Sequence, residues 1–408
     1  MQSLKEFYKQ GNGPSSSHTM GPKKAAEMFK KEYKDADFFE VILYGSLAAT
    51  GKGHLTDYII EQTLKPIKVN IIFDKKTKCD VHPNTMVFVA YKQDREIGRW
   101  MVYSIGGGTI KIDGREDEEP KEVYYLNTFS EISEYCEKNN KKIYDYVYET
   151  EGENIKEFLA DIWKAMKASI NYGLEAEGTI PGKLNLKKRA KSIYSNINNN
   201  ETEEIKRTRL LTAYAYAVSE TNASGGELVT APTCGSCGVL PSALYYLQAS
   251  NNYTDEEIIN ALATAGIIGN IVKTNASISG AECGCQAEIG TACSMAAAAA
   301  SQLKKLDIYK IEHAAEIAME HHMGLTCDPI YGYVQIPCIE RNAVAAIRAI
   351  DASNISMLLD ETQKISFDLI VDTMYETGKD LRSHYRETST GGLAKKYCRN
   401  KYYNADMQ

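Results

Sequence analysis

Hydrophobic and polar positions follow a mixed helix and strand pattern in about the first 125 residues of the chain. The segment KKAAEMFKKEY at 23–33 follows Pro22 and is rich in helix formers. Proline favours the first helical position, so a helix is predicted there, and a second one over 55–64. Apolar runs predict strands at 38–45, 67–73, 86–91, 97–105 and 122–126. Together these elements predict an α/β domain with a mixed sheet.

Beyond residue 155 the strand signals nearly vanish and Ala-rich segments with a helical pattern take over. Helices are predicted over 155–173, 203–222, 237–249, 255–272, 286–305, 309–322 and 339–351. The stretch 138–155 is polar and charge-rich, which is typical of a junction. We therefore expect an N-terminal domain over 1–145 and a mostly helical domain with a C-terminal tail over 155–408. The predicted fold class is α+β.

Composition and charge exclude several classes of protein. The chain has 408 residues, of which 43% are hydrophobic, and its formal net charge is −7. An acidic balance argues against nucleic-acid binding, which needs a basic face. The longest nearly apolar run, 259–272, is too short to span a membrane, and the N-terminus lacks the pattern of a signal peptide. We expect a cytoplasmic protein without membrane or nucleic-acid partners.

Seven of the ten cysteines lie between Cys234 and Cys338. Without an export signal this clustering favours metal ligation or a thiol site over disulfides, although a single cysteine is often only a small buried hydrophobe. The Cys234-x-x-Cys237 pair resembles a redox or metal pair, and its role is left open. Cys285, Cys327 and Cys338 come from separate segments. Three ligands on a cubane cluster would leave one iron open, and an open metal acts as a Lewis acid.

Two histidines stand in glycine- and hydroxyl-rich loops before predicted helices. His18 lies in GPSSSHTMGP at 13–22, and His54 lies in ATGKGHLTD at 49–57. The first loop offers the hydroxyls of Ser15, Ser16, Ser17 and Thr19. Hydroxyls and free N–H groups at a helix start suit a carboxylate or phosphate, and a helix N-terminus lowers the pKa of a histidine. The alternatives are a solvated Ser-rich turn and a helix-capping turn.

Seven longer segments occur in one order along nearly the whole chain. They are GPSSSHTMGP, GKGHLTD, YSIGGG, VTAPT, NASISGAECGCQAEIG, GLTCDPIYGYVQIPCIERNA and YRETSTGGLA. In these motifs, over roughly residues 1–398, the chain resembles the iron–sulfur-dependent L-serine dehydratases (L-serine ammonia-lyases) of the type with both domains fused. The resemblance implies a [4Fe–4S] cluster in the helical domain and an N-terminal domain like the substrate-binding regulatory domain of some phosphoglycerate dehydrogenases.

The resemblance also implies roles for individual residues. Cys285, Cys327 and Cys338 match the three cluster ligands, and His18 and His54 match proton-transfer residues of β-elimination from L-serine to pyruvate and ammonia. A homodimer and a role in amino-acid degradation and gluconeogenesis are expected from the family. The predicted substrate-binding residues are Ser15, Ser16, Ser17, Thr19, Asn127, Thr233 and Arg341. For Arg341 a structural ion pair is the alternative.

The C-terminal segment departs from the family pattern. Relatives often end in a cysteine shortly after GGLA that occupies the open iron, but here Cys398 is followed by ten residues. We expect 386–394 to be extended or turning and Cys398 to reach the cluster pocket; the alternative is an exposed thiol on a frayed terminus. Two other functions are alternatives. A pyridoxal-phosphate dehydratase needs a phosphate-binding loop, for which GGGTIKIDG at 106–114 is the nearest and a weak candidate. A non-enzymatic serine- or redox-sensing module would use the N-terminal domain and the thiols.

Overall fold

The computed structural model describes residues 1–77, 79, 81–115, 121–152, 154–360, 363–389 and 391–399. The chain forms two compact units. The N-terminal unit comprises residues 11–119. The helical unit comprises residues 1–10 and 120–408.

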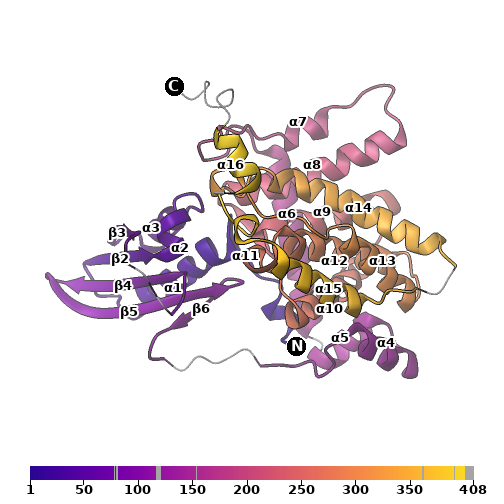
Figure 1. Ribbon diagram of the computed structural model, residues 1–408, viewed down its shortest axis with the longest axis horizontal. Coiled ribbons are helices and arrows are strands. Elements are labelled where there is room, and N and C mark those ends of the chain that lie inside the picture. The colour runs from indigo at the N-terminus through magenta and orange to yellow at the C-terminus, as the bar shows by residue number, and fades with distance from the viewer. Residues whose placement is uncertain are drawn as a thin grey trace. The chain divides into compact units, whose positions relative to one another are not determined.

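The N-terminal unit is a mixed five-stranded sheet with helices on one face (Figure 1). The strand order is β3-β2-β4-β5-β6, in which β2 and β3 are parallel and the other pairs antiparallel. The strands are β2 (Phe38–Tyr44), β3 (Lys68–Asp74), β4 (Thr85–Lys92), β5 (Arg95–Gly106) and β6 (Thr109–Ile112). The other elements are β1 (Gln10–Asn12), the π-helical turn η2 (Ser16–Met20), α1 (Gly21–Glu32), α2 (Gly45–Thr50) and α3 (Thr56–Leu64).

Alternation along β2 explains which face of the sheet the helices cover. Phe39, Val41 and Leu43 are fully buried, whereas their neighbours in β2 are half-buried. Because successive strand residues point to opposite faces, these three side chains share one face, and they form a core with the apolar side of α1 and α3. Phe29 of α1 lies at its centre, 5.0 Å from the Trp100 ring. This core fixes the starts of α1 and α3, where the histidine loops lie.

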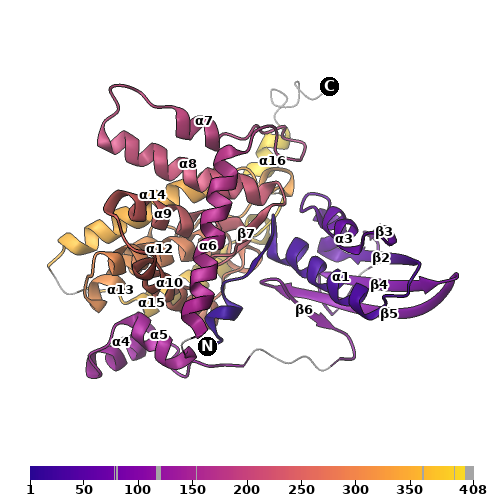
Figure 2. The same ribbon diagram turned by 180° about the vertical axis from the view of Figure 1, so that it is seen from behind.

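The helical unit is built around α12, which is buried along almost its whole length. Residues 296–300 are all alanine, and such small side chains let neighbouring helices approach closely. Four helices pack against α12 (Thr291–Leu303): α9 (Val239–Asn251), α10 (Asp255–Asn275), α13 (Ile308–Glu320) and α14 (Cys338–Leu358). Figure 2 shows α6 (Asn154–Glu175) crossing the same bundle, and α8 (Glu203–Ala223) packs against α14.

Shorter elements complete the helical unit. They are η1 (Leu4–Glu6), α4 (Phe129–Lys138), α5 (Ile143–Glu151), α7 (Ala190–Ser195), β7 (Glu227–Val229), η3 (Cys234–Ser236), α11 (Gly280–Cys283), η4 (Gln286–Gly290), η5 (Ile330–Gly332), α15 (Phe367–Asp380), η6 (Ser383–Tyr385) and α16 (Gly392–Arg399). No helix among the described residues is both long and apolar enough to cross a membrane.

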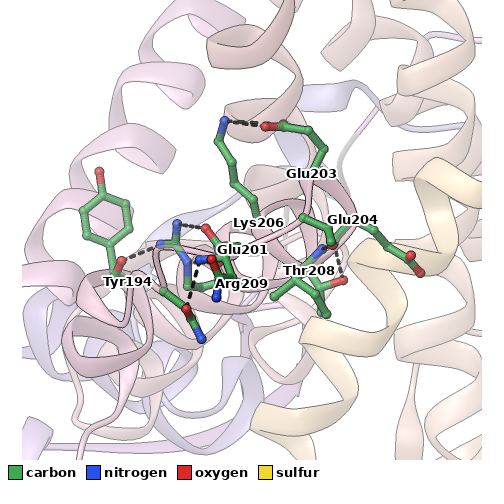
Figure 3. A network of polar contacts seen from close by, with 11 residues as sticks. Tyr194, Glu201, Glu203, Glu204, Lys206, Thr208 and Arg209 are labelled. Carbon is green, nitrogen blue, oxygen red and sulfur yellow. Dashed lines mark hydrogen bonds and ion pairs between the residues drawn. The ribbon is translucent and has the colours of Figure 1, made fainter.

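A buried ion pair secures the polar stretch between α7 and α8. Arg209 donates from Nε and Nη2 to the two carboxylate oxygens of Glu201, at 2.6 and 2.9 Å, and from Nη1 to the Tyr194 carbonyl oxygen (Figure 3). The Arg209 and Glu201 side chains are only 11% and 8% exposed. A bidentate pair of this kind holds a loop more firmly than a single surface contact does.

The structure confirms the predicted α+β class and all predicted elements except one, and it contains elements that the sequence pattern did not predict. The expected strand at 122–126 is wrong: Glu122 forms only an isolated bridge with Gln2, and Tyr124 is buried in the helical core, where its hydroxyl donates to Glu151 Oε1 at 2.6 Å. Residues 109–112 form the unpredicted strand β6, because Gly107 and Gly108 adopt positive φ and turn the chain back on β5.

The boundary between the units falls near residue 120, earlier than the stretch 138–155 that the sequence suggested. Helices α4 and α5 explain the difference. Phe129, Ile132 and Tyr146 on these helices are buried in the core of the helical unit. Their polar outer faces make this stretch look like a linker in the sequence.

Candidate functional site

The histidine loops of the N-terminal unit converge. The His18 and His54 rings lie 4.6 Å apart with planes tilted by 41°. Each histidine is about 5% exposed. Two buried imidazoles that lie next to each other form a site suited to proton transfer.

Reciprocal hydrogen bonds between the loops hold this histidine pair in place. Thr19 Oγ1 donates to the His54 carbonyl oxygen at 2.7 Å, and Thr56 Oγ1 donates to the His18 carbonyl oxygen at 2.6 Å. Each threonine follows one histidine closely in the sequence and fixes the backbone of the other. The geometry therefore depends on both loops together.

The ring nitrogens of the two histidines have different surroundings. His18 Nδ1 lies 2.9 Å from Ser17 Oγ, and His18 Nε2 lies 2.9 Å from Ser46 Oγ. His54 Nδ1 is buried and has no hydrogen-bond partner among the described residues. A buried polar atom without a partner is costly and calls for an explanation such as a ligand or a reacting group.

Burial sets the charge of both histidines. Burial and the neighbouring His54 lower the pKa of His18 well below 6.5. Burial lowers the pKa of His54 to about 4. Both imidazoles are therefore neutral at pH 7, which is the form that accepts a proton.

The predicted anion-binding hydroxyls mostly bond within their own loop. Ser15 Oγ accepts a hydrogen bond from the His18 backbone N–H at 3.2 Å and lies 3.3 Å from Ser17 Oγ. The Thr19 hydroxyl donates to the His54 carbonyl oxygen, as described above. Ser16 starts the π-helical turn η2. The role of these four residues in substrate binding stays a prediction.

A group of buried thiols and a carboxylate forms a second site, in the helical unit. Cys285 directly precedes the π-helical turn η4, which carries Glu288, and Cys327 lies in the loop after α13. The ligand atoms of these three residues all lie within 4.8 Å of one another, a spacing that could hold a metal. Glu288 Oε2 is 3.8 Å from Cys285 Sγ and 4.0 Å from Cys327 Sγ.

Cys338 and Arg341 belong to the same surroundings. Cys338 is the first residue of α14 and interacts electrostatically with Cys285. Arg341 Nη1 donates to the Thr326 carbonyl oxygen at 2.6 Å, and its Nη2 is 4.0 Å from Asp328 Oδ1. Burial opposes its charge, but Cys285 and Cys338 hold the pKa of the Arg341 guanidinium above its ordinary value. Arg341 thus combines a long ion pair with a place beside the thiols.

Cys327 and Cys338 stay protonated while no metal replaces their protons. The hydrogen bond with Cys285, together with burial, raises the pKa of Cys327 well above its ordinary value, and burial does the same for Cys338. Metal ligands must lose their protons, and a bound cation supplies the compensation that makes this possible. Three buried cysteines beside one another are a donor set that suits iron–sulfur clusters, so these residues fit the expected cofactor.

The other predicted residues lie at varied positions in the helical unit. Thr233 contacts the thiol site, because its Oγ1 donates to Glu288 Oε1 at 2.7 Å. Asn127 Oδ1 accepts a hydrogen bond from the Met1 amino group at 3.0 Å. Cys234 and Cys237 are buried in and beside η3, and burial raises the pKa of both thiols.

The C-terminal segment lies along the backbone of Cys327. The Cys327 N–H donates to the Tyr385 carbonyl oxygen at 2.7 Å, and the Thr388 N–H donates to the Cys327 carbonyl oxygen at 3.0 Å. Cys398 is half-buried on α16 and is a hydrogen-bond neighbour of Tyr331. Residues 386–389 and 391 are irregular, as predicted, but residues 392–394 already belong to α16.

Sequence reasoning missed Glu288, Ser46 and Thr56. Glu288 follows Cys285 at a spacing of three residues, which in a helical turn places both on one side. That spacing was the available signal. For Ser46 the sequence contains no such signal, because this residue lies in a different segment from the histidine loops. Only the folded structure brings its hydroxyl to His18.

Comparison with known proteins agrees with both units. The family model described as serine dehydratase beta chain matches residues 3–66 and 61–115, and the model described as serine dehydratase alpha chain matches residues 93–394. Domains of these two kinds, with the histidine pair in one and the thiol group in the other, define an enzyme of the lyase class. The chain belongs to the serine dehydratase family.

Curated relatives match over nearly their full length. The L-serine dehydratase of Haemophilus influenzae is 39% identical, with 98% of this chain and 100% of the relative covered. L-serine dehydratase 2 of Escherichia coli is 37% identical over 97% of this chain and 99% of the relative. The L-serine dehydratase of Streptomyces coelicolor is 35% identical, with 96% and 98% covered.

Proposed function

We propose that the protein eliminates the β-hydroxyl of L-serine and yields pyruvate and ammonia. The observation that carries the proposal is the group of buried thiols in the helical unit, where Cys285 and Cys327 approach each other beside Glu288 and Cys338 interacts with Cys285. The names of the relatives and the neutral histidine pair support the same reaction. A non-enzymatic sensing module is not favoured.

Cys285, Cys327 and Cys338 are proposed to hold a [4Fe–4S] cluster. Such a cluster with one open iron supplies a Lewis acid, which lowers the cost of hydroxide departure from serine. Arg341 lies beside these thiols and offers a guanidinium for the substrate carboxylate, which it can bind in bidentate fashion.

His54 is the proposed base. It is neutral at pH 7, and its buried Nδ1 makes none of the hydrogen bonds found among the described residues, which leaves room for a new partner there. His18 is proposed to position His54 and the surrounding loop, because both of its own ring nitrogens already have hydroxyl partners. A neutral imidazole base contributes ~10²–10⁴-fold to such a reaction.

The elimination balances without any redox partner. The Cα proton passes to the imidazole, the Cα–H electron pair forms the Cα–Cβ double bond, and the hydroxyl leaves Cβ with its bonding pair. The resulting enamine tautomerises to an imine, whose hydrolysis releases ammonia and pyruvate. A cytoplasmic homodimer is part of the proposal on the strength of the family resemblance.

The test uses the full chain prepared without oxygen. We expect about four irons and four sulfides per chain, the composition of one [4Fe–4S] cluster, and pyruvate formation from L-serine. D-serine serves as the stereochemical control. An absorption spectrum distinguishes a broad iron–sulfur band that bleaches in air from the aldimine band of a pyridoxal-phosphate enzyme. Cluster-containing protein that forms no pyruvate from L-serine would contradict the proposed reaction.

A further inference from the structure

Ser46 is a half-buried residue in the first turn of α2, and its hydroxyl lies at the ring of His18. Ser46 Oγ is 2.9 Å from His18 Nε2, and Ser17 Oγ is 2.9 Å from Nδ1 of the same ring. Two hydroxyls thus hold the ring at both of its nitrogen atoms. A ring that is held in this way keeps one orientation, and this orientation sets the face that it turns toward His54, whose ring centre is 4.6 Å away.

The backbone of Ser46 is fixed by contacts other than those with His18. The Ser46 N–H donates to the Pro83 carbonyl oxygen at 2.8 Å, and the Thr50 hydroxyl donates to the Ser46 carbonyl oxygen at 2.9 Å. Gly45 has a φ of +52°, and a Cβ added there would clash with the same Pro83 oxygen. Glycine is therefore required directly before Ser46. The Ser46 hydroxyl projects from a backbone that is anchored on both sides.

Ser17, at the other edge of the ring, has a support of its own. The Ser104 hydroxyl donates to the Ser17 carbonyl oxygen at 2.7 Å, and Ser104 belongs to β5. Ser46 comes two residues after the end of β2. The two hydroxyls that hold His18 are thus supported from different strands of one sheet, and rigid elements of this kind position a side chain more precisely than a free loop does.

Hydroxyl partners orient a histidine without giving it a charge. A neutral imidazole has one N–H donor and one acceptor nitrogen, and a hydroxyl can donate or accept, so Ser17 and Ser46 satisfy the ring in either tautomer. A carboxylate at either place would favour the charged imidazolium instead. Burial keeps His18 neutral, although the backbone of Ser46 acts on its pKa in the opposite direction. Such partners suit a ring that has to keep its place without carrying charge.

We propose that Ser46 is a positioning residue of the histidine pair, whose hydroxyl, together with that of Ser17, holds the His18 ring in the orientation that packs against His54. Ser46 acts through His18 in this arrangement. The kinetic consequence rests on the function proposed above, because His54 is the proposed base. The enclosure of the two rings does not depend on that function and can be measured separately.

The first experiment measures how fast diethyl pyrocarbonate modifies each histidine of the anaerobic full chain, followed by mass spectrometry of tryptic peptides. Cleavage after Lys9 and Lys52 places His18 and His54 on separate peptides. The exposed His384 is the internal standard.

The variants separate the hydroxyl of Ser46 from its backbone. Ser46→Ala removes the hydroxyl and keeps the backbone, whereas Ser46→Thr keeps both. Thr63→Ala is the matched control, because it removes a half-buried hydroxyl of the same unit that donates to the Ile59 carbonyl oxygen within α3.

The parent should react slowly at both histidines, since each is about 5% exposed. In Ser46→Ala both His18 and His54 should react severalfold faster, because the His18 ring loses one of its two supports and no longer covers His54. Thr63→Ala and Ser46→Thr should react at the parent rate. Parent rates at both histidines in Ser46→Ala overturn the inference, and so does a Ser46→Thr variant that reacts like Ser46→Ala.

The second experiment measures turnover of L-serine by the cluster-containing protein. Ser46→Ala should lower kcat severalfold at an unchanged KM. In a His18→Gln background it should lower kcat no further, because a residue that acts through His18 has no effect once His18 is lost. A full additional loss in that background overturns the inference. A parent protein that forms no pyruvate would refute the proposed function, and the modification rates would then decide the inference alone.

Ser46→Cys covers the case in which Ser46→Ala fails to fold. Its thiol occupies the place of the hydroxyl but is a weak hydrogen-bond donor and acceptor. His18 and His54 should again be modified faster than in the parent, and parent rates at both would overturn the inference.

Discussion

The histidine pair and the thiol group are both buried, and burial has opposite consequences for them. Removing water disfavours a charged imidazolium, so the pKa of His54 falls to about 4 and the residue is a free base at neutral pH. Removing water also disfavours a thiolate, so the pKa of Cys338 rises well above its ordinary value. The histidines are neutral when the chain has folded, whereas Cys338 would lose its proton only in exchange for a bound cation.

The two groups also differ in how the chain positions them. Short loops cross-linked by Thr19 and Thr56 hold the histidines. The packing of α12 against α13 and α14 brings together Cys285 and Cys327, which are 42 residues apart in the sequence, and Cys338, which follows Cys327 by 11 residues. Single side-chain changes in the histidine loops should therefore act on kinetics, and changes at the cysteines should act on the presence of the cofactor.

The largest expected effect is loss of the cluster. Replacing Cys285, Cys327 or Cys338 with Ala removes one of the three proposed ligands, so iron content after anaerobic reconstitution should fall to near zero and activity should vanish. Cys234→Ala and Cys237→Ala are the matched controls. They remove buried cysteines of the same unit that are not among the three proposed ligands. Cluster loss in either control would show that the ligand assignment is wrong.

A large kinetic effect with an intact cluster is expected from His54→Gln. Its kcat should fall by ~10²–10⁴-fold because the base is lost. His18→Gln should lower kcat less, since His18 only positions the loop in the proposed mechanism. Iron content and the visible spectrum should equal those of the parent in both variants. Near-normal turnover in His54→Gln would remove this residue from the mechanism, and a greater loss in His18→Gln would exchange the two roles.

The elements were predictable wherever a long apolar run or a helical repeat dominated the sequence. The strand at 38–45 is an apolar run interrupted by Glu40, and the Ala-rich helices repeat apolar positions over many turns, so both kinds appear close to the predicted bounds. The strand at 122–126 failed because Tyr124 and its neighbours are apolar for a different reason, namely burial against helices. β6 is only four residues long and depends on a glycine turn, which an apolar pattern does not reveal.

The site was predictable in its residue types but not in its contacts. Chemistry alone drew attention to His18 and His54, but their mutual distance depends on two threonine hydrogen bonds from separate loops. Glu288 was overlooked because a glutamate on an apolar helical turn looks like an ordinary surface residue in sequence. Only the distances to Cys285 and Cys327 reveal its place.

A moderate effect is expected on stability, which should fall as the pH falls. The folded-state pKa of His54 is about 4, below the ordinary value of 6.5, so the unfolded state binds more protons between these pH values. Stability of the N-terminal unit should therefore rise with pH across this window and be lost as pH falls, by on the order of 3 kcal/mol from this residue. His18 shifts in the same direction and adds to the loss.

Fluorescence of a single tryptophan can measure this dependence in the full chain. Trp100 lies in the core of the N-terminal unit, and Trp163 lies in the helical unit. In a Trp163→Phe background, urea unfolding followed through Trp100 reports on the N-terminal unit. His54→Gln should flatten the dependence between pH 6.5 and 4, whereas His82→Gln, which removes a half-buried histidine of the same unit, should flatten it less. An unchanged slope in His54→Gln would mean that this residue does not resist protonation.

The smallest expected effect concerns the tail. Three residues near the C-terminus are held at the loop of the thiol site: Tyr385 and Thr388 form hydrogen bonds with the backbone of Cys327, and the Leu393 N–H donates to the Asp328 carboxylate. Cys398 follows on α16 beside Tyr331. If its thiol binds the open iron at rest, Cys398→Ala should abolish any lag before steady turnover and increase oxygen sensitivity. If Cys398 is instead a thiol without a role at the cluster, Cys398→Ala should keep the lag and oxygen sensitivity of the parent. Progress curves started with L-serine, with Lys396→Ala as a control on the same helix, decide between the two outcomes.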